Sequence, residues 1–189
     1  VTLMEAGPVL LGSSPARARR LVHEYLRDQG VEVLLGCPVR FHDGGVAAED
    51  GRRLVADLIV PATGVAPPDV FGHSGLLTGS DGGLWVDHHL RSPSDGRIFG
   101  GGDSVSFRGR GLPRLGVFAI RQGPLLYRNL QAVLEARPLG IFRPQRRFLY
   151  VLELGDGTGL AVYGPLAWRG RLAARIKHRI DRRFMAEYT

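Results

Sequence analysis

The chain has 189 residues, of which 44% are hydrophobic, and its 25 lysines and arginines exceed its 18 aspartates and glutamates, giving a formal charge of +7. This length is enough for one domain or two small ones, and no apolar run approaches the roughly 20 residues of a membrane-spanning helix. The single cysteine, Cys37, excludes a disulfide framework and a cysteine zinc site within the chain, and no other ligand pattern predicts a metal site.

The first 35 residues follow the pattern of a strand, a helix and a second strand. Residues 1–5 predict a short strand, and an apolar stripe over 16–29 predicts a helix. Ser14-Pro15 supplies a capping hydroxyl and a first-turn proline, and Gly30 supplies the helix stop. The apolar run 31–35 predicts a parallel strand that is buried on both faces. Together these elements form a βαβ unit.

A small antiparallel sheet is expected next, in strands 39–42, 46–48 and 54–56. Residues 57–60 predict another buried strand. That strand leads into the Gly/Pro-rich segment 61–68, which is the best candidate for a domain boundary.

The remaining pattern is again mixed. Residues 84–87 and 97–99 predict short strands, and residues 116–136 predict a helix with one apolar face. The glycine-rich stretch 155–159 predicts a hairpin between two strands that lie within 148–163.

The tail carries most of the charge, because residues 141–189 have a net charge of +6. Residues 168–185 predict a basic amphipathic helix that either lies on an anionic membrane or packs on the hairpin with a solvated basic face. No nucleic-acid-binding motif accompanies the arginines, so nucleic acid is not expected as a partner. The apolar residues that recur at every fourth position are Trp168, Leu172, Ile176, Ile180 and Phe184.

The segment Gly100-Gly101-Gly102-Asp103 is the most informative one chemically. Its glycines let the backbone approach a ligand, and Asp103 could accept hydrogen bonds from a polyol; the alternative is a tight turn in which Asp103 caps the next segment. Shortly afterwards, Gly116 begins the predicted helix. The free amides and the partial positive charge at the start of this helix would stabilise a reduced flavin ring. The alternative is an ordinary packing helix.

Two separate segments, in the correct order, resemble known flavoproteins. Residues 90–103 resemble the second FAD motif of the two-dinucleotide-fold flavoproteins. Residues 112–124 resemble the helix that faces the isoalloxazine ring in the type II NADH dehydrogenase-like branch of the FAD/NAD(P)-dependent pyridine nucleotide-disulfide oxidoreductases. Residues 142–145 and 180–185 agree with this branch. Ala62-Thr63-Gly64 resembles the segment where the family's NAD domain returns to the FAD domain.

The resemblance implies an α/β protein in three parts. Residues 1–68 would be the remainder of a Rossmann-like NAD(P)-binding domain, 69–140 the second segment of an FAD-binding domain, and 141–189 a carboxyl-terminal hairpin and helix. In the family, the glycine-rich fingerprints that hold the two pyrophosphates precede Val1, so the chain is expected to be the carboxyl-terminal portion of an enzyme and inactive alone. The missing first strand of the NAD-type sheet would leave an open edge, through which a homodimer is expected.

The resemblance assigns seven residues to FAD. Asp103 would bond the ribityl chain, Gly102 would allow its approach, and Gln122 would lie near the substrate side of the flavin. Backbone amides at the start of the helix would face the flavin ring, and these belong to Gly116, Val117, Phe118 and Ala119.

Three residues are assigned to the nicotinamide nucleotide. Glu5, at a strand end, would hold the adenosine ribose hydroxyls and favour NADH, because a carboxylate repels the additional phosphate of NADPH. The alternative for Glu5 is a solvated side chain. Thr63 and Gly64 would lie at the junction of nicotinamide and flavin. No residue is assigned to catalysis.

The implied function is that of an FAD-dependent NADH dehydrogenase-like oxidoreductase, which passes hydride from NADH to the flavin and electrons to a quinone or another acceptor. The expected location is cytoplasmic, or peripheral on the cytoplasmic face of the membrane through Trp168–Met185. Leu115-Gly116 stands where type II dehydrogenases commonly carry Ala-Gln, so the acceptor is left open. The rival interpretations are a non-catalytic interaction module that binds no flavin, and a redox module that serves a selenium- or sulfur-handling partner.

Overall fold

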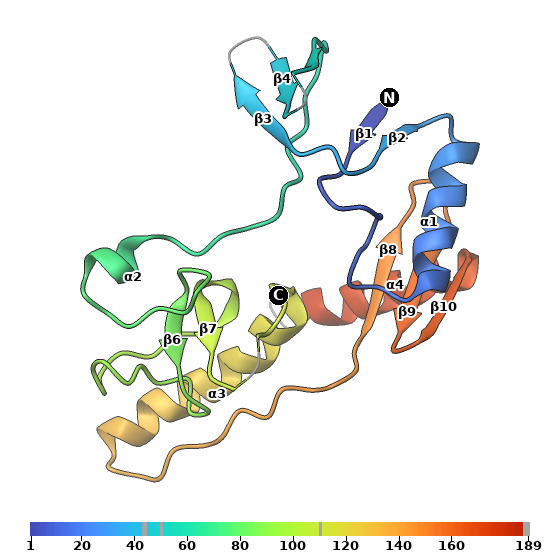
Figure 1. Ribbon diagram of the computed structural model, residues 1–189. Helices are drawn as coiled ribbons and strands as arrows, with labels where there is room; N and C mark the ends of the chain where they lie inside the picture. Colours follow the sequence, from blue (N-terminus) through green and yellow to red (C-terminus); the bar gives the residue numbers. More distant parts are fainter. Residues whose placement is uncertain (43–44, 50, 110, 187–189) are drawn as a thin grey trace. The chain divides into compact units, whose positions relative to one another are not determined.

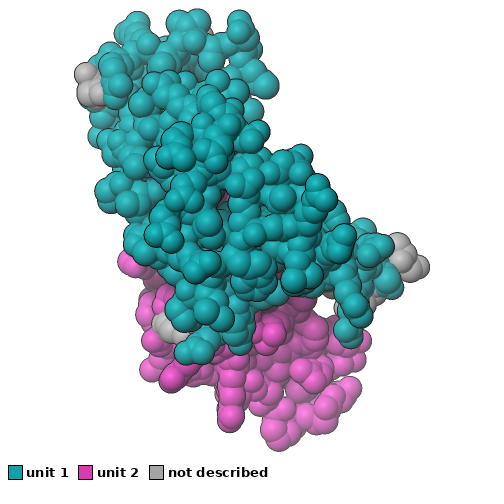
Figure 2. Space-filling model, turned by 90° about the vertical axis from the view of Figure 1, so that its right-hand side faces the viewer, with its two compact units in different colours: residues 1–60, 147–189 teal, residues 61–146 magenta. Residues whose placement is uncertain are grey.

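The structure is a computed structural model, and it describes residues 1–42, 45–49, 51–109 and 111–186 (Figure 1). The chain forms two compact units, residues 1–60 with 147–189 and residues 61–146 (Figure 2). It passes from the first unit to the second where the Gly/Pro-rich segment begins. The expected division into 1–68, 69–140 and 141–189 stays a prediction, and each unit is described by itself.

The first unit begins with the expected βαβ arrangement. Strand β1 (Thr2–Met4) pairs in parallel with β2 (Glu32–Leu34), and helix α1 (Ala16–Asp28) connects them. The helix ends as predicted, because Gly30 has φ +70° and its amide donates to the carbonyl of Arg27 over 2.9 Å.

Two expectations for this region are wrong. Ser14 does not cap α1, since Pro15 takes the N-cap position without a side-chain bond and the Ser14 hydroxyl shares a 2.5 Å hydrogen bond with the hydroxyl of Tyr150. Strand β2 is only half-buried, and Leu35 beyond it is 40% exposed. A strand is buried on both faces only when other elements cover both faces of its sheet, and among the described elements the helix that packs against β2 is α1.

The small antiparallel sheet is present as predicted, with β3 (Val39–His42), β4 (Gly45–Ala48) and β5 (Arg53–Leu54). The buried strand expected at 57–60 is wrong. These residues form no strand, and Leu58 and Val60 are 79% and 74% exposed. A strand needs a paired neighbour to satisfy its backbone, and no described strand pairs with them.

The carboxyl-terminal region forms a three-stranded antiparallel sheet followed by a helix. The predicted hairpin is β8 (Leu149–Glu153) with β9 (Gly159–Tyr163), and a third strand, β10 (Leu166–Gly170), pairs with β9. The helix expected over 168–185 therefore begins later, as α4 (Arg171–Met185). Trp168 lies in β10 opposite Ala161, because the chain turns at Gly164 and continues as a strand.

This sheet is covered on both faces. Leu160 and Val162 of β9 share a hydrophobic core with Ala18 and Val22 of α1. The alternate position, Gly159, faces α4, where an added Cβ would lie 2.9 Å from the amide nitrogen of Ala174. Because successive strand residues point to opposite faces, the sheet lies between α1 and α4. The helix that follows β1 is thus packed on the carboxyl-terminal sheet.

The second unit is built around a parallel strand pair and a long helix. After the short helix α2 (Val70–His73), strand β6 (Leu84–Val86) pairs in parallel with β7 (Val105–Phe107). A 3-10 turn, η1 (Gly102–Ser104), leads into β7, and helix α3 (Gly116–Leu134) follows as predicted.

One predicted strand of this unit is wrong and one observed strand was not predicted. The strand expected at 97–99 is only an isolated bridge between Phe99 and Arg91. The partner of β6 is β7 instead, which comes after the glycine-rich bend. The bend of Gly100–Asp103 therefore connects the bridge at Phe99 to β7, the strand that pairs with β6.

Candidate functional site

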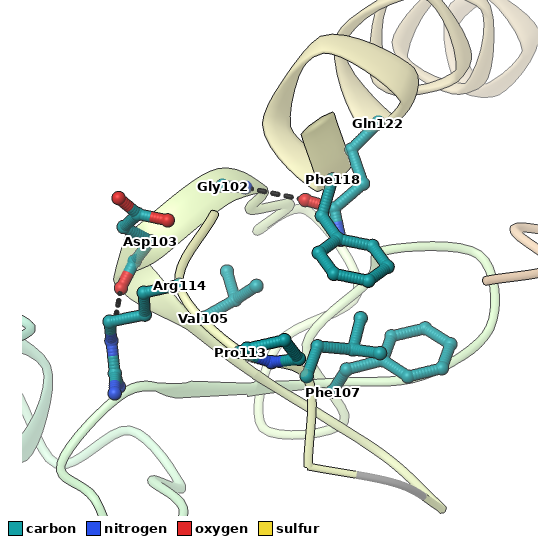
Figure 3. A pocket seen from close by; sticks show the side chains of 9 residues that line it. Gly102, Asp103, Val105, Phe107, Pro113, Arg114, Phe118 and Gln122 are labelled. Atoms are coloured by element: carbon teal, nitrogen blue, oxygen red, sulfur yellow. Dashed lines mark hydrogen bonds between the residues drawn. The ribbon is translucent and has the colours of Figure 1, made fainter. Parts of the chain in front are cut away.

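The glycine-rich bend lies against the first turns of α3. The amide of Gly102 donates a 2.6 Å hydrogen bond to Oε1 of Gln122 (Figure 3). Gly102 has φ +70°, a conformation that L side chains rarely adopt, and an added Cβ would lie 3.4 Å from that of Ala119. The tight turn and the close approach to the helix both explain glycine at this position.

Gly100 has a different role from Gly102. An added Cβ there would lie 2.8 Å from Cγ1 of Val105 and 3.0 Å from Cδ2 of Leu84. Packing between the strands therefore explains this glycine, and a ligand is not needed to account for it.

A small pocket lies between the bend and the first turns of α3. Four of the residues assigned to FAD line it, namely Gly102, Asp103, Phe118 and Gln122 (Figure 3). The cavity holds about 10 Å³, the size of one water molecule, so a flavin ring does not fit inside it. A cofactor at this place would lie over the bend and the helix start. The other lining residues are Val105, Phe107, Leu112, Pro113 and Arg114.

The side chain of Asp103 is exposed and points away from Arg114 (Figure 3). Its carboxylate makes no hydrogen bond or ion pair with the described residues, and the turn η1 has no side-chain cap. The alternative in which Asp103 caps the next segment is therefore wrong. A free carboxylate beside a glycine bend is able to accept hydrogen bonds from ligand hydroxyls.

The start of α3 offers backbone donors. Leu115 takes the N-cap position without a side-chain bond, and the first turn has no acidic residue. Within the described chain, the amides of Gly116 and Val117 form no hydrogen bond, whereas that of Phe118 donates to Leu115 over 2.9 Å. A helix start of this kind carries partial positive charge. Val117 itself does not line the pocket.

An arginine that the sequence did not single out connects these parts. Arg114 donates through Nε to the carbonyl of Asp103 over 2.9 Å and through Nη2 to Asp81 over 2.6 Å. The pKa of Asp81 is lowered, first by a hydrogen bond from the Ser106 hydroxyl and further by the amide of Gly83 and by Arg114. The only signal in the sequence was the position of an arginine two residues before the helix start.

The three residues assigned to NADH belong to different units. Glu5 follows β1 in the first unit, half-buried, and its Oε1 accepts a 2.7 Å hydrogen bond from the amide of Gly7. Glu5 is thus not simply solvated, and within the described residues only one of its oxygens accepts a hydrogen bond. Thr63 and Gly64 are exposed at the beginning of the second unit, where Gly64 has φ +88°.

Other candidate sites add little. Cys37 is buried at 5% exposure with a guanidinium nitrogen of Arg52 3.7 Å from its sulfur. Across residues 1–42, 45–49, 51–109 and 111–186, no group of three His, Cys, Asp or Glu side chains could hold a metal ion. None of the described helices is both long enough and apolar enough to cross a membrane.

The sheet, the bend and the helix start belong to a known class of fold. The structure resembles the FAD-dependent pyridine nucleotide-disulphide oxidoreductase of Desulfovibrio vulgaris, with 27% identity and a TM-score of 0.66 over 86% of this chain and 42% of that one. It also shares its fold with the sulfide:quinone oxidoreductase of Aquifex aeolicus, at 14% identity and a TM-score of 0.73 over 99% of this chain and 49% of that one. The expected α/β fold of Rossmann-type oxidoreductases is confirmed.

The family follows from the sequence match. A family model described as pyridine nucleotide-disulphide oxidoreductase matches residues 1–123. The chain belongs to the pyridine nucleotide-disulphide oxidoreductase family, as predicted. It is 28% identical over 183 residues to the type II NADH:quinone oxidoreductase of Haemophilus influenzae, covering 92% of this chain and 41% of that protein. FAD and NADH, the predicted cofactors, are those in the names of these relatives.

The chain is short compared with these relatives. It spans between 41% and 49% of the length of three curated proteins that it matches. What those whole proteins do is therefore carried to this chain only as a proposal.

Proposed function

We propose that this chain is part of an FAD-dependent oxidoreductase that takes hydride from NADH. The observation that carries the proposal is the Gly102–Asp103 bend, which lies against the start of α3 and presents a free carboxylate. Family membership supports the same function. FAD, when bound, would supply the redox chemistry, and the chain would supply placement and electrostatics.

The residues present fit FAD in three respects. Gly102 has no Cβ over the bend, Asp103 has a carboxylate that no described residue pairs with and that could meet the ribityl hydroxyls, and α3 begins without an acidic residue. The amides of Gly116 and Val117 would stabilise negative charge on the reduced ring. Phe118 and Ala119 continue this first turn.

For NADH, the proposal keeps Glu5 of the first unit for the ribose hydroxyls, and Thr63 and Gly64 for the nicotinamide. Glu5 keeps Oε2 for a ribose hydroxyl, while Oε1 is held by Gly7. Its negative charge favours NADH over NADPH. Thr63 and Gly64 would lie beside the nicotinamide.

The electron acceptor is proposed to be a quinone or a similar small oxidant. The relative from Haemophilus influenzae is named as an NADH:quinone oxidoreductase, which supports this choice. Leu115-Gly116 replaces the Ala-Gln pair common in type II dehydrogenases, so we do not assign a quinone contact to a particular residue.

A peripheral position on the cytoplasmic face of a membrane is proposed through α4. The outward face of this helix is arginine-rich, and in the described chain these side chains form no ion pair. Two exposed apolar residues, Leu172 and Ile180, lie beside them. Anionic lipid suits such a surface. The arginines are Arg171, Arg175, Arg179, Arg182 and Arg183.

In the described part of the chain, β1 and β2 pair only with each other, so their sheet has open edges. A homodimer through such an edge stays a prediction. Sedimentation of the intact protein would give its mass in solution.

The proposed function is tested by the absorption spectrum and the redox behaviour of the intact protein, by which we mean the complete protein that contains this chain. We expect purified protein to carry the flavin absorption bands, and to lose them on anaerobic addition of NADH. NADPH should act more slowly. A colourless protein that does not bind added FAD would contradict the proposal and favour the non-catalytic interaction module.

A further inference from the structure

The bend at Asp103 is held from both sides by hydrogen bonds to its backbone. On one side, the amide of Gly102 donates to Gln122 over 2.6 Å. On the other side, the carbonyl of Asp103 accepts from Nε of Arg114 over 2.9 Å. Two consecutive residues are thus fixed by two side chains from separate places, the interior of α3 and the loop before it (Figure 3).

The side chain of Gln122 is buried and is used in the hydrogen bond with Gly102. It is 1% exposed, and its Oε1 accepts the bond from Gly102. Removing the acceptor would leave the Gly102 amide without its partner in a part-buried position, which is costly. The residue therefore acts on the bend, and its oxygen is not available to a substrate.

Arg114 is held in place at its other end. Its Nη2 lies 2.6 Å from Oδ2 of Asp81, and the other oxygen of Asp81 accepts from the hydroxyl of Ser106 in β7. The Gly83 amide adds a third donor over 3.2 Å. With its side chain only 22% exposed, Arg114 has a preorganised guanidinium that links the strand pair, the bend and the loop that begins α3.

We propose that Gln122 and Arg114 are positioning residues of the flavin site. They hold the backbone of Gly102 and Asp103 so that the Asp103 carboxylate stays directed outward, where a ribityl hydroxyl of FAD would meet it. This inference rests on the proposed function, and it changes the role expected for Gln122 from a group beside the substrate to one beneath the cofactor.

The first experiment measures FAD affinity in the intact protein. Apoprotein is titrated with FAD, and the quenching of flavin fluorescence gives the dissociation constant. We expect Gln122→Leu to weaken binding by about tenfold or more. Gln122→Glu should restore most of the affinity, because a carboxyl group offers an acceptor oxygen in either protonation state. Gln131→Leu, the same change on the same helix away from the bend, should stay within about twofold.

The second experiment tests whether the two residues act on one bend. Arg114→Gln should also weaken FAD binding, and the double variant with Gln122→Leu should lose less than the two single losses combined. Circular dichroism of each variant reports whether it is folded. Arg114 is partly exposed, so its variant keeps the test available if Gln122→Leu does not fold.

The outcomes separate the two proposals. An unmodified protein that binds no FAD overturns the proposed function and this inference with it. An unmodified protein that binds FAD, with folded Gln122→Leu and Arg114→Gln variants that bind equally well, overturns the positioning role alone. Independent losses in the double variant would also contradict the shared bend.

Discussion

The hydroxyl of Tyr25 donates a hydrogen bond to the carbonyl oxygen of Leu154, which lies 129 residues further along the chain. Tyr25 belongs to α1 and Leu154 follows β8, so the bond joins the amino-terminal βαβ unit to the carboxyl-terminal sheet. The guanidinium of Arg169 lies 4.6 Å from the centre of the Tyr25 ring and forms an ion pair with Asp156 over 2.9 Å. This contact helps to make one unit from the two ends of the chain.

Replacing Tyr25 with phenylalanine should therefore weaken the first unit. The ring, which is 8% exposed, would keep its packing, while the carbonyl of Leu154 would lose its donor. We expect about 1 kcal/mol less free energy of unfolding in a denaturant titration. Tyr163→Phe is the control, because that side chain is 45% exposed, and an equal loss there would contradict the role of the hydrogen bond.

Enlarging Gly159 should separate α4 from the sheet. An added Cβ would lie 2.9 Å from the backbone nitrogen of Ala174 and 3.1 Å from Cγ1 of Val151. Overpacking of this kind costs about 1–3 kcal/mol, so Gly159→Ala should lower the melting temperature. Gly12→Ala, with open space around the added atom, should melt like the unmodified protein.

Asn129 should be important to the second unit, because it bonds three backbone groups. Its Nδ2 donates to the carbonyls of His89 and Gly140 over 2.8 and 3.1 Å, and its Oδ1 accepts from the amide of Gly140 over 2.8 Å. The side chain is 1% exposed. We expect Asn129→Leu to cost at least about 2 kcal/mol of unfolding free energy, since it leaves buried polar groups unpaired. If Gln131→Leu costs as much, the hydrogen bonds of Asn129 are not the cause.

The ionisation of Asp81 should make the second unit sensitive to acid. Its pKa is lowered from 3.8, mainly by the Ser106 hydroxyl, so its stabilising contribution is present above the unfolded value and is lost as pH falls through the lower folded value. The difference in unfolding free energy between the unmodified protein and Asp81→Asn should therefore be largest near neutral pH and shrink below about pH 4. A difference that stays constant down to pH 2 would show that the charge of Asp81 is unimportant.

The arginine face of α4 should control binding to lipid. We expect the intact protein to float with vesicles that contain anionic phospholipid, and to lose this at high salt. Replacing Arg175 and Arg179 with glutamine should weaken binding, by about 1 kcal/mol for each charge. The matched control is Arg17→Gln with Arg20→Gln on α1. Equal flotation of both double variants, or none by the unmodified protein, would exclude this use of α4.

Local patterns were sufficient for much of the fold. Helix α1 followed from its apolar stripe and from Gly30, whose φ of +70° ends it, and the β8–β9 hairpin followed from its glycine-rich turn. One error occurred where the same pattern suits two structures. The four-residue spacing that begins at Trp168 suits a helix, yet the pairing of Trp168 with Ala161 placed it in β10.

The sequence by itself determined the family, the α/β pattern and the bend with its aspartate, because these depend on periodicity, turn chemistry and motif order. Only the tertiary structure decided what each residue of the bend contacts: Gly100 meets Val105, Gly102 meets Gln122, and Asp103 meets Arg114 through its backbone alone. The physical reason is that a hydrogen bond between residues 20 or 11 positions apart depends on how helices and strands pack, which no local pattern records.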